Sequence, residues 1–323
     1  MFHFRFIFFV AIFLILAAAL LYGLIRNLLR ICMGKAKKRH WMVFLLCACV
    51  TGIIVWGMTK GFERFEVRHV EFVSESVPKN FDGYRIVIFA DAHVGTFTGD
   101  RRRLLREAVS AINAQKPDAV MFCGDIVNRS PEELTPFIKE LCSLEAKDGV
   151  YSVLGNHDYS LYQHNATEQQ KSAALERTKS LERSFGWHLL LNENMKIGRN
   201  GDTIYVAGEE NQGSGPFPKY ADVKKTMKDI PDSAFVIMLQ HDPSAWREHI
   251  LEDTNAKLTL SGHTHAGQFV LFGWSVSSLM YKEVNGAYYE DDRMLYVTSG
   301  LGGVIPFRFG VSREIVVITL KRR

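Results

Sequence analysis

The hydrophobic pattern divides the chain into two parts. Two uncharged runs come first, at residues 6–25 (20 residues) and 41–59 (19 residues), and each is long enough to cross about 30 Å of hydrocarbon as a helix. From about residue 78, short apolar runs alternate with longer helical ones, which is typical of a layered α/β domain. We therefore expect two transmembrane helices followed by one soluble α/β domain.

Within the soluble part, helical periodicity predicts helices near residues 100–115, 130–148 and 167–184. The first has an apolar face that contains Leu104, Leu105, Ala108, Val109 and Ile112. Ser130, Pro131 and Glu133 fit the N-cap, N1 and N3 positions of the second helix. Short apolar runs predict strands at 85–90, 118–123, 150–154, 188–191, 203–207, 234–239, 258–260, 294–298 and 314–320.

The first apolar run has an alternative interpretation as a cleaved signal peptide, because it is N-terminal and contains alanines at 17–19. Its length exceeds the usual apolar region of about 7 to 15 residues, and an equally apolar run follows it. A helical hairpin explains both runs. We expect a membrane anchor over residues 1–68 and a soluble domain over 79–323.

The charge distribution separates the same two parts. The chain has a formal net charge of +4, but residues 1–68 carry ten Lys and Arg against two Glu, which leaves a balance of −4 for the other 255 residues. Six of the cations lie between the two apolar runs, at 26–40. This asymmetry favours a cytoplasmic loop, with both chain ends outside the plasma (inner) membrane. The slightly acidic soluble domain argues against a nucleic acid partner.

Composition excludes two further classes of protein. A hydrophobic share of 47% with 23% charged residues is unlike a disordered polyelectrolyte. The five cysteines include no CxxC spacing, so the chain is not a disulfide-stabilised module.

Five polar clusters follow predicted strands, where the loops of an α/β sheet bind ligands. A single Asp-x-His or Gly-Asp is common at strand ends, so only the five together are informative. They are Asp-Ala-His at 91–93, Gly-Asp at 124–125, Gly-Asn-His-Asp at 155–158, Gln-His-Asp at 240–242 and Gly-His-Thr-His at 262–265.

The donor types of these clusters indicate the chemistry. Carboxylate, imidazole and amide oxygen together suit Mn²⁺, Fe or Zn²⁺ rather than Ca²⁺. Two such ions about 3.5 to 4 Å apart neutralise charge on a phosphoryl group and acidify a bridging water. The pattern therefore predicts hydrolysis of a phosphate ester or anhydride.

The order of the five clusters resembles the calcineurin-like metallophosphoesterase superfamily, over about residues 80–323. Gly-His-Thr-His-Ala-Gly-Gln at 262–268 and Ser-Gly-Leu-Gly-Gly at 299–303 resemble its membrane-associated branch. That branch includes bacterial YaeI- and YkuE-type phosphodiesterases and the UDP-2,3-diacylglucosamine pyrophosphatase of lipid A synthesis. The resemblance implies an α/β fold, a four-layer αββα sandwich, preceded here by the two transmembrane helices.

The resemblance also implies a site with two divalent metal ions, Mn²⁺ or Fe and Zn²⁺. His157 would face the substrate rather than bind metal, and Asp158 would orient its ring. Asp125 would bridge the two ions. The implied ligands are Asp91, His93, Asp125 and His265 for one ion, and Asn156, His241 and His263 together with Asp125 for the other.

We therefore expect a membrane-anchored phosphohydrolase that cleaves phosphodiester or pyrophosphate bonds. Lipid-linked substrates, such as UDP-2,3-diacylglucosamine-like glycolipids or phospholipid-type diesters, fit the anchor and the branch. Gly-Asn-His-Asp in place of Gly-Asn-His-Glu disfavours a phosphoprotein substrate. The alternatives are a nuclease or nucleotide phosphodiesterase, and a non-catalytic scaffold on the same fold.

Three further features each have two interpretations. The arginines at 101–103 either meet a phosphate or membrane surface, or begin a solvated helix. Arg308 either reaches the site or forms a structural ion pair. Several apolar residues of the loops either form an acyl-chain groove or pack in the core; they are Phe217, Tyr220, Phe272, Trp274, Leu279, Met280 and Tyr281.

Overall fold

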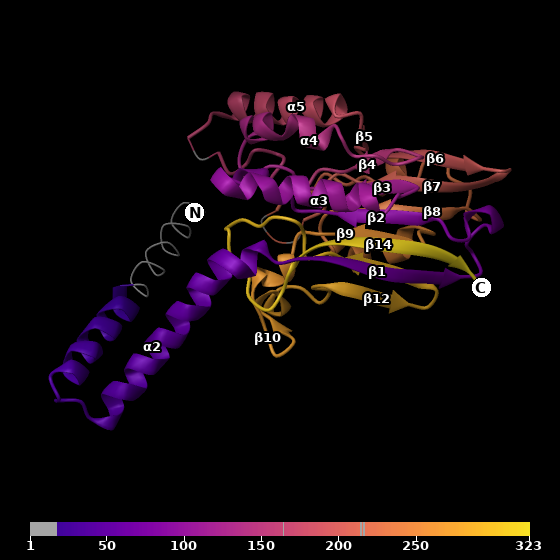
Figure 1. The fold of residues 1–323 in the computed structure, drawn as a ribbon. Coiled ribbons are helices and arrows are strands. Elements are labelled where there is room, and N and C mark those ends of the chain that lie inside the picture. The colour runs from indigo at the N-terminus through magenta and orange to yellow at the C-terminus, as the bar shows by residue number, and fades with distance from the viewer. Residues whose placement is uncertain (1–17, 164, 214, 216) are drawn as a thin grey trace. The chain divides into compact units, whose positions relative to one another are not determined.

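The structure is a computed structural model, and it describes residues 18–163, 165–213, 215 and 217–323 (Figure 1). The chain forms two compact units, Met1–Gly61 and Phe62–Arg323.

The first unit is helical. A helix over residues 18–32 is followed by α2 (Lys38–Trp56), which continues into a π-helical turn at Gly57–Gly61. Together, Lys38–Gly61 form a 24-residue helix that is long and apolar enough to cross a membrane. This helix contains the second predicted span, 41–59. Most of the first predicted span, 6–25, lies outside the described residues, so the structure shows one candidate span rather than two.

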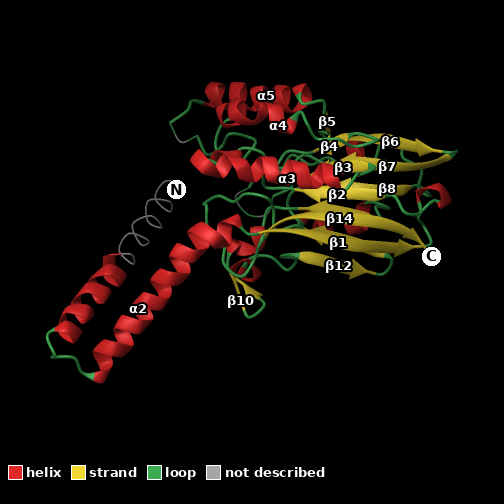
Figure 2. Ribbon diagram, in the orientation of Figure 1, coloured by secondary structure: helices red, strands yellow, loops and turns green. Residues whose placement is uncertain are grey.

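The second unit is built on two six-stranded mixed sheets (Figure 2). The first sheet has the order β1-β14-β2-β3-β4-β5 and the second β12-β13-β9-β8-β7-β6, with β10 and β11 forming a separate hairpin. The first sheet consists of β1 (Phe65–Ser74), β14 (Arg313–Arg322), β2 (Arg85–Phe89), β3 (Ala119–Phe122), β4 (Val150–Ser152) and β5 (His188–Leu189). The second consists of β12 (Gly286–Glu290), β13 (Arg293–Val297), β9 (Leu258–Ser261), β8 (Phe235–Leu239), β7 (Asp202–Gly208) and β6 (Glu193–Arg199).

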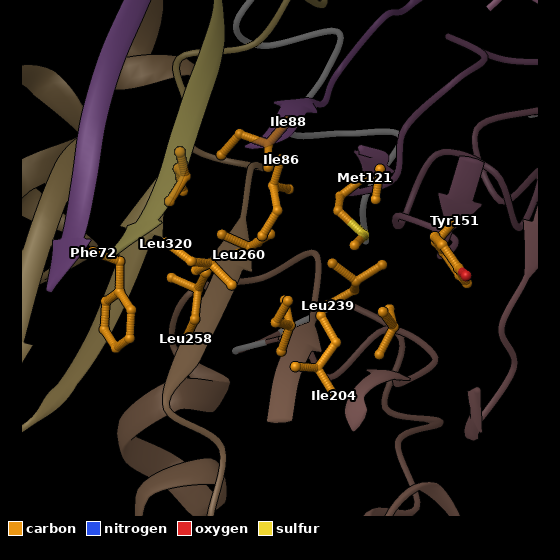
Figure 3. Packing of buried hydrophobic residues seen from close by; sticks show 14 of the residues in the cluster. Phe72, Ile86, Ile88, Met121, Tyr151, Ile204, Leu239, Leu258, Leu260 and Leu320 are labelled. Carbon is orange, nitrogen blue, oxygen red and sulfur yellow. The ribbon is translucent and has the colours of Figure 1, made fainter. Parts of the chain in front are cut away.

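The inner strands of the first sheet, such as β2 and β3, are apolar on both faces because both faces are covered. In β2, Ile86 and Ile88 point between the sheets, whereas Val87 and Phe89 join the outer core under the helices. This alternation follows from the two-residue period of a strand. Figure 3 shows Ile86, Ile88 and Met121 of the first sheet packed against residues of the second, such as Ile204 and Leu260.

Helices cover the outer faces of both sheets, which gives the four layers of the expected sandwich. α3 (Arg102–Ala114), α4 (Ile138–Leu141) and α5 (Glu168–Ser184) lie on the first sheet. On the second sheet, a third core forms around Trp246 and Ile250, which lie in the π-helical turn that leads into α7 (Leu251–Asp253). The remaining short helices are α6 (Val223–Thr226) and the 3-10 turns Lys79–Phe81, Val94–Thr96, Gly99–Arg101, Pro131–Phe137, His265–Gln268 and Val276–Leu279.

The predicted helix over 130–148 is wrong in its detail. The segment forms the 3-10 turn Pro131–Phe137 and only one turn of α-helix, α4. Pro136 lies inside it and has no N–H to donate, which interrupts α-helical bonding. The carboxylate of Glu133 accepts the N–H groups of Asn128 (2.6 Å) and Arg129 (3.1 Å), and the Ser130 side chain makes no cap hydrogen bond. The expected capping box is therefore absent.

The sheet begins earlier in the chain than the expected domain start at residue 79. β1 pairs in parallel with β14 along its whole length, from Phe65 with Arg313 to Ser74 with Arg322. Its edge position explains the mixture of charged and apolar residues that separates it from the other, buried strands. The edge strands β12 and β6 and the hairpin of β10 (Val270–Leu271) and β11 (Trp274–Ser275) were also not predicted.

Candidate metal centre

The five polar clusters follow the carboxyl ends of five strands. β2, β3 and β4 are neighbouring parallel strands of the first sheet, and β8 and β9 are neighbouring parallel strands of the second. Parallel strands end at the same edge of a sheet, where α/β proteins bind ligands. The clusters at 91–93, 124–125 and 155–158 therefore meet those at 240–242 and 262–265.

The backbone of these loops is unusual. Five of the seven predicted ligands have a positive φ, at 51° for Asp91, 39° for His93, 60° for Asp125, 71° for His263 and 50° for His265. Residues other than glycine rarely adopt this left-handed conformation. Such strain persists only where the surrounding structure imposes it, and it concentrates at functional sites.

One group of donors consists of Asp91, His93 and His265, whose ligand atoms lie within 4.8 Å of one another. His265 Nε2 lies 3.4 Å from Asp91 Oδ1 and 3.2 Å from His93 Nε2. All three side chains are buried. They are three of the four residues expected to hold the first ion.

A second group consists of Asp125, His241 and His263, again within 4.8 Å. Asp125 Oδ2 lies 3.1 Å from His241 Nε2 and 3.6 Å from His93 Nε2 of the first group. Asn156 Oδ1 lies 2.8 Å from His263 Nδ1. Asp125 therefore lies between the two groups, and the structure brings all seven predicted ligands together.

The hydrogen bonds of this centre leave lone pairs directed at one another. His93 Nδ1 donates to Val127 O (3.2 Å) and His241 Nδ1 donates to Cys123 O (2.7 Å). In the neutral rings, each Nε2 atom therefore keeps its lone pair. The lone pair of His241 faces the carboxylate of Asp125, so a proton or a metal ion has to lie between them. The residues fit divalent metal ions for this reason.

The ionisation of these groups supports the same conclusion. Burial, followed by the effect of His157, lowers the pKa of His93 to about 3, so its ring is neutral as a metal ligand requires. Burial would raise the pKa of Asp125, but His241 and His157 hold it well below its ordinary value. Although burial lowers the pKa of His241, Asp125 raises it to about 10. The position between Asp125 and His241 strongly favours positive charge.

The ring of His157 lies beside the centre and is held on two sides. Its Nδ1 donates to Asn128 O at 2.7 Å, and its face stacks on Tyr162 with ring centroids 4.2 Å apart. Its backbone N–H donates to Asp125 Oδ1 at 2.8 Å. A ligand atom of His157 also lies within 4.8 Å of donors of His93 and Asp125, which places the ring at the edge of the expected metal site.

The role expected for Asp158 is wrong. Its carboxylate is buried and accepts four backbone N–H groups, from Asp125 (2.8 Å), Ile126 (2.9 Å), Val127 (3.2 Å) and Gly155 (2.8 Å). The His157 ring is oriented by Asn128 O instead. Asp158 therefore fixes the loop that carries Asp125. Hydrogen bonds from separate loops leave no signal in a local sequence pattern.

Two glycines allow the loops to approach the ligands closely. A Cβ atom at Gly155 would touch the Asp125 carboxylate, and one at Gly262 would touch the Asp91 carboxylate. Either substitution would push a ligand away, which explains the glycine in Gly-Asn-His-Asp and in Gly-His-Thr-His.

The centre forms the floor of a pocket of about 200 Å³. Its floor is polar and includes Asp125, Asn156 and His263, whereas Phe217 and Met280 contribute apolar walls. The other lining residues are His157, Thr264, His265, Ser277, Tyr281 and Val304. The pocket thus has a polar floor and apolar walls.

Two tyrosines that orient predicted ligands were not identified from the sequence. Asn156 Nδ2 donates to Tyr162 OH at 2.8 Å, which directs Asn156 Oδ1 towards the centre. His263 Nε2 lies 2.7 Å from Tyr281 OH, so its Nδ1 lone pair faces the centre. No motif links either tyrosine to its partner, and only the fold brings them together.

The other features with two interpretations are resolved by their contacts. Arg308 is buried and donates to main-chain oxygens, for example Ser299 O (2.6 Å) and Ser312 O (3.0 Å), so it holds its loop instead of reaching the site or pairing with an acid. Arg103 pairs with Glu63 (2.9 Å) and with Glu107 (3.0 Å) at a helix start.

Core packing is the wrong interpretation for most of the apolar loop residues. Five of them are exposed, namely Tyr220, Phe272, Trp274, Leu279 and Met280.

Comparison with known proteins agrees with the geometry. Residues 84–267 match the family model described as calcineurin-like phosphoesterase. The chain is 30% identical over 303 residues to the uncharacterized metallophosphoesterase YkuE of Bacillus subtilis, covering 90% of this chain and 99% of that one. It is 28% identical to the UDP-2,3-diacylglucosamine pyrophosphatase LpxG of Chlamydia trachomatis, covering 82% of this chain and 93% of that one.

A transmembrane protein with metallophosphoesterase domain from Danio rerio is 29% identical over 288 residues, which cover 86% of this chain. The match spans 62% of that longer protein. Family, fold and donor set agree, and the chain belongs to the calcineurin-like phosphoesterase family as a metal-dependent phosphoesterase.

Proposed function

We propose that this protein is a membrane-anchored phosphohydrolase that uses two divalent ions to cleave phosphodiester or pyrophosphate bonds in lipid-linked substrates. The observation that carries the proposal is the pair of donor groups on either side of Asp125, at the floor of a pocket with apolar walls.

In this proposal, Asp91, His93 and His265 would hold one ion, His241, His263 and Asn156 would hold the other, and Asp125, which lies between the two groups, would serve both. When bound, the two ions supply positive charge for the phosphoryl oxygens and lower the pKa of a bound water. The chain contributes the orientation of its donors. Main-chain oxygens fix the rings of His93 and His241, and tyrosines fix Asn156 and His263.

His157 is assigned to the leaving group. Its Nδ1–H is engaged by Asn128 O, so Nε2 is the ring atom that can serve the pocket. A protonated Nε2 can donate to the departing oxygen and stabilise its charge. The stacking of the ring on Tyr162 keeps this atom in place without a carboxylate partner.

Two observations support a lipid-linked substrate. The Lys38–Gly61 helix is suited to a bilayer, and tethering raises the effective concentration of substrates in the same membrane. The relative LpxG is named as a pyrophosphatase of a diacylated, nucleotide-linked sugar. The apolar wall at Phe217 and Met280 suits a substrate with an apolar arm beside its phosphate.

The expected orientation affects the choice of substrate. Six cations at residues 26–40 lie before the helix or in its first turn, which favours a cytoplasmic N-terminal side and an extracytoplasmic catalytic unit. A phospholipid-type diester of the cell envelope then fits better than a cytoplasmic precursor of lipid A. Added protease should digest the catalytic unit in intact spheroplasts, whereas full protection would overturn this orientation.

The activity test uses the full chain purified in detergent and loaded separately with Mn²⁺, Fe²⁺ or Zn²⁺. We expect turnover of bis-aryl phosphodiesters, and higher kcat/KM for a micelle-embedded diester or UDP-linked lipid than for a soluble diester. Equal kcat/KM for soluble and micelle-embedded diesters would refute the lipid-linked part. Hydrolysis of monoesters alone would refute the diester and pyrophosphate assignment.

A further inference from the structure

The segment that follows the metal-binding motif exposes apolar side chains. Phe272 is 100% exposed, and Leu279 and Met280 are each 74% exposed. We use the name apolar rim for the group of large apolar residues exposed on this segment and on the neighbouring loop, namely Leu271, Phe272, Trp274, Val276, Leu279, Met280, Val304 and Ile305. Contiguous exposed apolar groups of this kind mark interaction sites.

Phe272 is an exposed aromatic residue at a turn position where a polar residue is usual. It lies at the tip of the β10–β11 hairpin, in a two-residue turn with φ of 51° at Phe272 and 81° at Gly273. Such turns favour Asn or Asp at the first position, because a bulky side chain is strained at positive φ. Phe272 therefore combines backbone strain with full exposure of an aromatic ring, and neither stabilises the isolated domain.

The apolar rim is held firmly against the catalytic pocket. Ser275 Oγ donates to Ala266 O (2.7 Å) and Ser277 Oγ to Thr264 O (3.2 Å), both within the metal-binding motif. Met280 and Val304 belong to the rim and also line the pocket. An apolar group held by the rim would therefore lie directly beside a phosphate in the pocket.

The rim lies at the end of the catalytic unit where the chain enters it. Val270 N donates to Phe309 O (2.8 Å), so the β10–β11 hairpin packs on the loop that leads to β14. β14 begins at Arg313, which pairs with Phe65 at the start of β1, and Arg313 Nε donates to Phe62 O (2.9 Å). Figure 2 shows the β10 hairpin at this end of the sandwich.

Only a short stretch of chain joins this end of the catalytic unit to the apolar helix. The apolar helix ends at Gly61 and β1 begins at Phe65, so the connecting residues span only about 10 Å when fully extended. The side chain of Phe62 is buried in the catalytic unit. Arg102 and Lys282 are exposed cations. Arg102 precedes Arg103, which pairs with Glu63 near the chain entry, and Lys282 follows Tyr281 of the pocket. Both suit anionic lipid headgroups.

We propose that the apolar rim inserts into the lipid bilayer, so that the pocket receives the phosphate of a membrane lipid without the lipid leaving the membrane. The rim is then a second membrane contact, made by a different part of the chain from the helix. This inference rests on the membrane anchoring in the proposed function, and it narrows the substrate class to amphiphiles whose apolar arm stays in the bilayer.

Trp274 provides a direct test in the full chain. The protein is reconstituted into phosphatidylcholine and phosphatidylglycerol vesicles with plain or acyl-brominated lipids, and Trp274→Phe isolates the emission of Trp274 by difference. We expect brominated lipids to quench this emission. If the emission of Trp274 stays unquenched, the proposal is overturned. This is also the result expected if a second copy of the chain covers the rim. Trp41 and Trp56 report on the helix separately, and their lack of quenching would refute both the anchor and the rim contact.

A second test uses Phe272→Glu combined with Leu279→Glu, neither of which lines the pocket. We expect turnover of a vesicle-borne diester to fall about tenfold, because charged groups oppose interfacial binding, with unchanged turnover of a soluble bis-aryl diester. The matched control is Tyr289→Glu, which lies on exposed β12 opposite Met294, at the far end of β13. If the ratio of vesicle-borne to soluble turnover is the same in the double variant as in the wild type, the proposal is overturned. If the wild type itself does not hydrolyse the soluble diester, only the proposed function is refuted.

Discussion

Two adjoining segments after β9 differ in opposite ways from the usual pattern, in which polar side chains are exposed and apolar side chains are buried. The motif at 262–268 buries polar side chains such as His265 and Gln268, whereas residues 270–281 expose Phe272, Leu279 and Met280. Buried polar groups are unfavourable without partners, and exposed apolar groups lose the gain of burial.

This comparison indicates that each segment needs a binding partner from outside the chain. The buried segment presents lone pairs that face one another, which divalent ions satisfy. The exposed segment presents strained and solvated apolar residues, which a bilayer would cover under the proposal above. Variants of the polar segment should affect every substrate, and variants of the apolar segment only membrane-borne ones.

Asp125→Ala should have the largest effect. It removes the carboxylate that lies between the two donor groups, so we expect metal-dependent turnover to fall roughly 1,000-fold or more, about 4 kcal/mol of transition-state stabilisation. The loss should be the same for soluble and vesicle-borne diesters. Steady-state kinetics combined with metal analysis checks this expectation.

The matched control for Asp125→Ala is Asp232→Ala, an exposed acid before β8, which should change neither turnover nor metal content. Full activity in Asp125→Ala, or loss of activity towards vesicle-borne substrate alone, would contradict the contrast between the two segments.

His157→Gln should have the next largest effect and should separate chemistry from metal binding. Loss of a proton donor to the leaving group should lower kcat roughly 100- to 1,000-fold, with both ions retained. The loss should grow as the leaving group becomes more basic, which a series of aryl phosphodiesters measures. His188→Gln, on exposed β5, is the control. A loss independent of the leaving group would exclude the proton-donor role.

Asp158→Asn should act on stability rather than on the leaving group. One amide oxygen cannot replace a carboxylate that accepts four N–H groups, and we expect a cost of about 2–4 kcal/mol. Thermal unfolding in detergent should show a lower midpoint and weaker metal binding. A leaving-group dependence like that of His157→Gln would instead restore the ring-orienting role.

Local patterns predicted the buried strands, and the resemblance carried by five local motifs implied the seven ligands that the structure brings together. Apolar runs such as 85–90 and 258–260 follow from burial on both faces of a sheet. The edge strand β1 escaped prediction because its charged residues interrupt that pattern. The partners of Asp158 and His263 escaped as well, since they are set by distances between loops that are far apart in sequence.

Tyr281 is the last residue of the exposed segment but contacts the buried one, and its variant should have the smallest effect. Its hydroxyl contacts His263 Nε2 at 2.7 Å, while the preceding Met280 belongs to the apolar rim. Tyr281→Phe should keep the apolar contact and lose the orientation of His263, which weakens metal affinity by about tenfold. Metal titration of turnover should show the shift, and saturating metal should restore most of the activity. Tyr289→Phe is the control. If Tyr281→Phe instead lowered turnover of vesicle-borne substrate alone, Tyr281 would act with the apolar rim and not with the metal-binding segment.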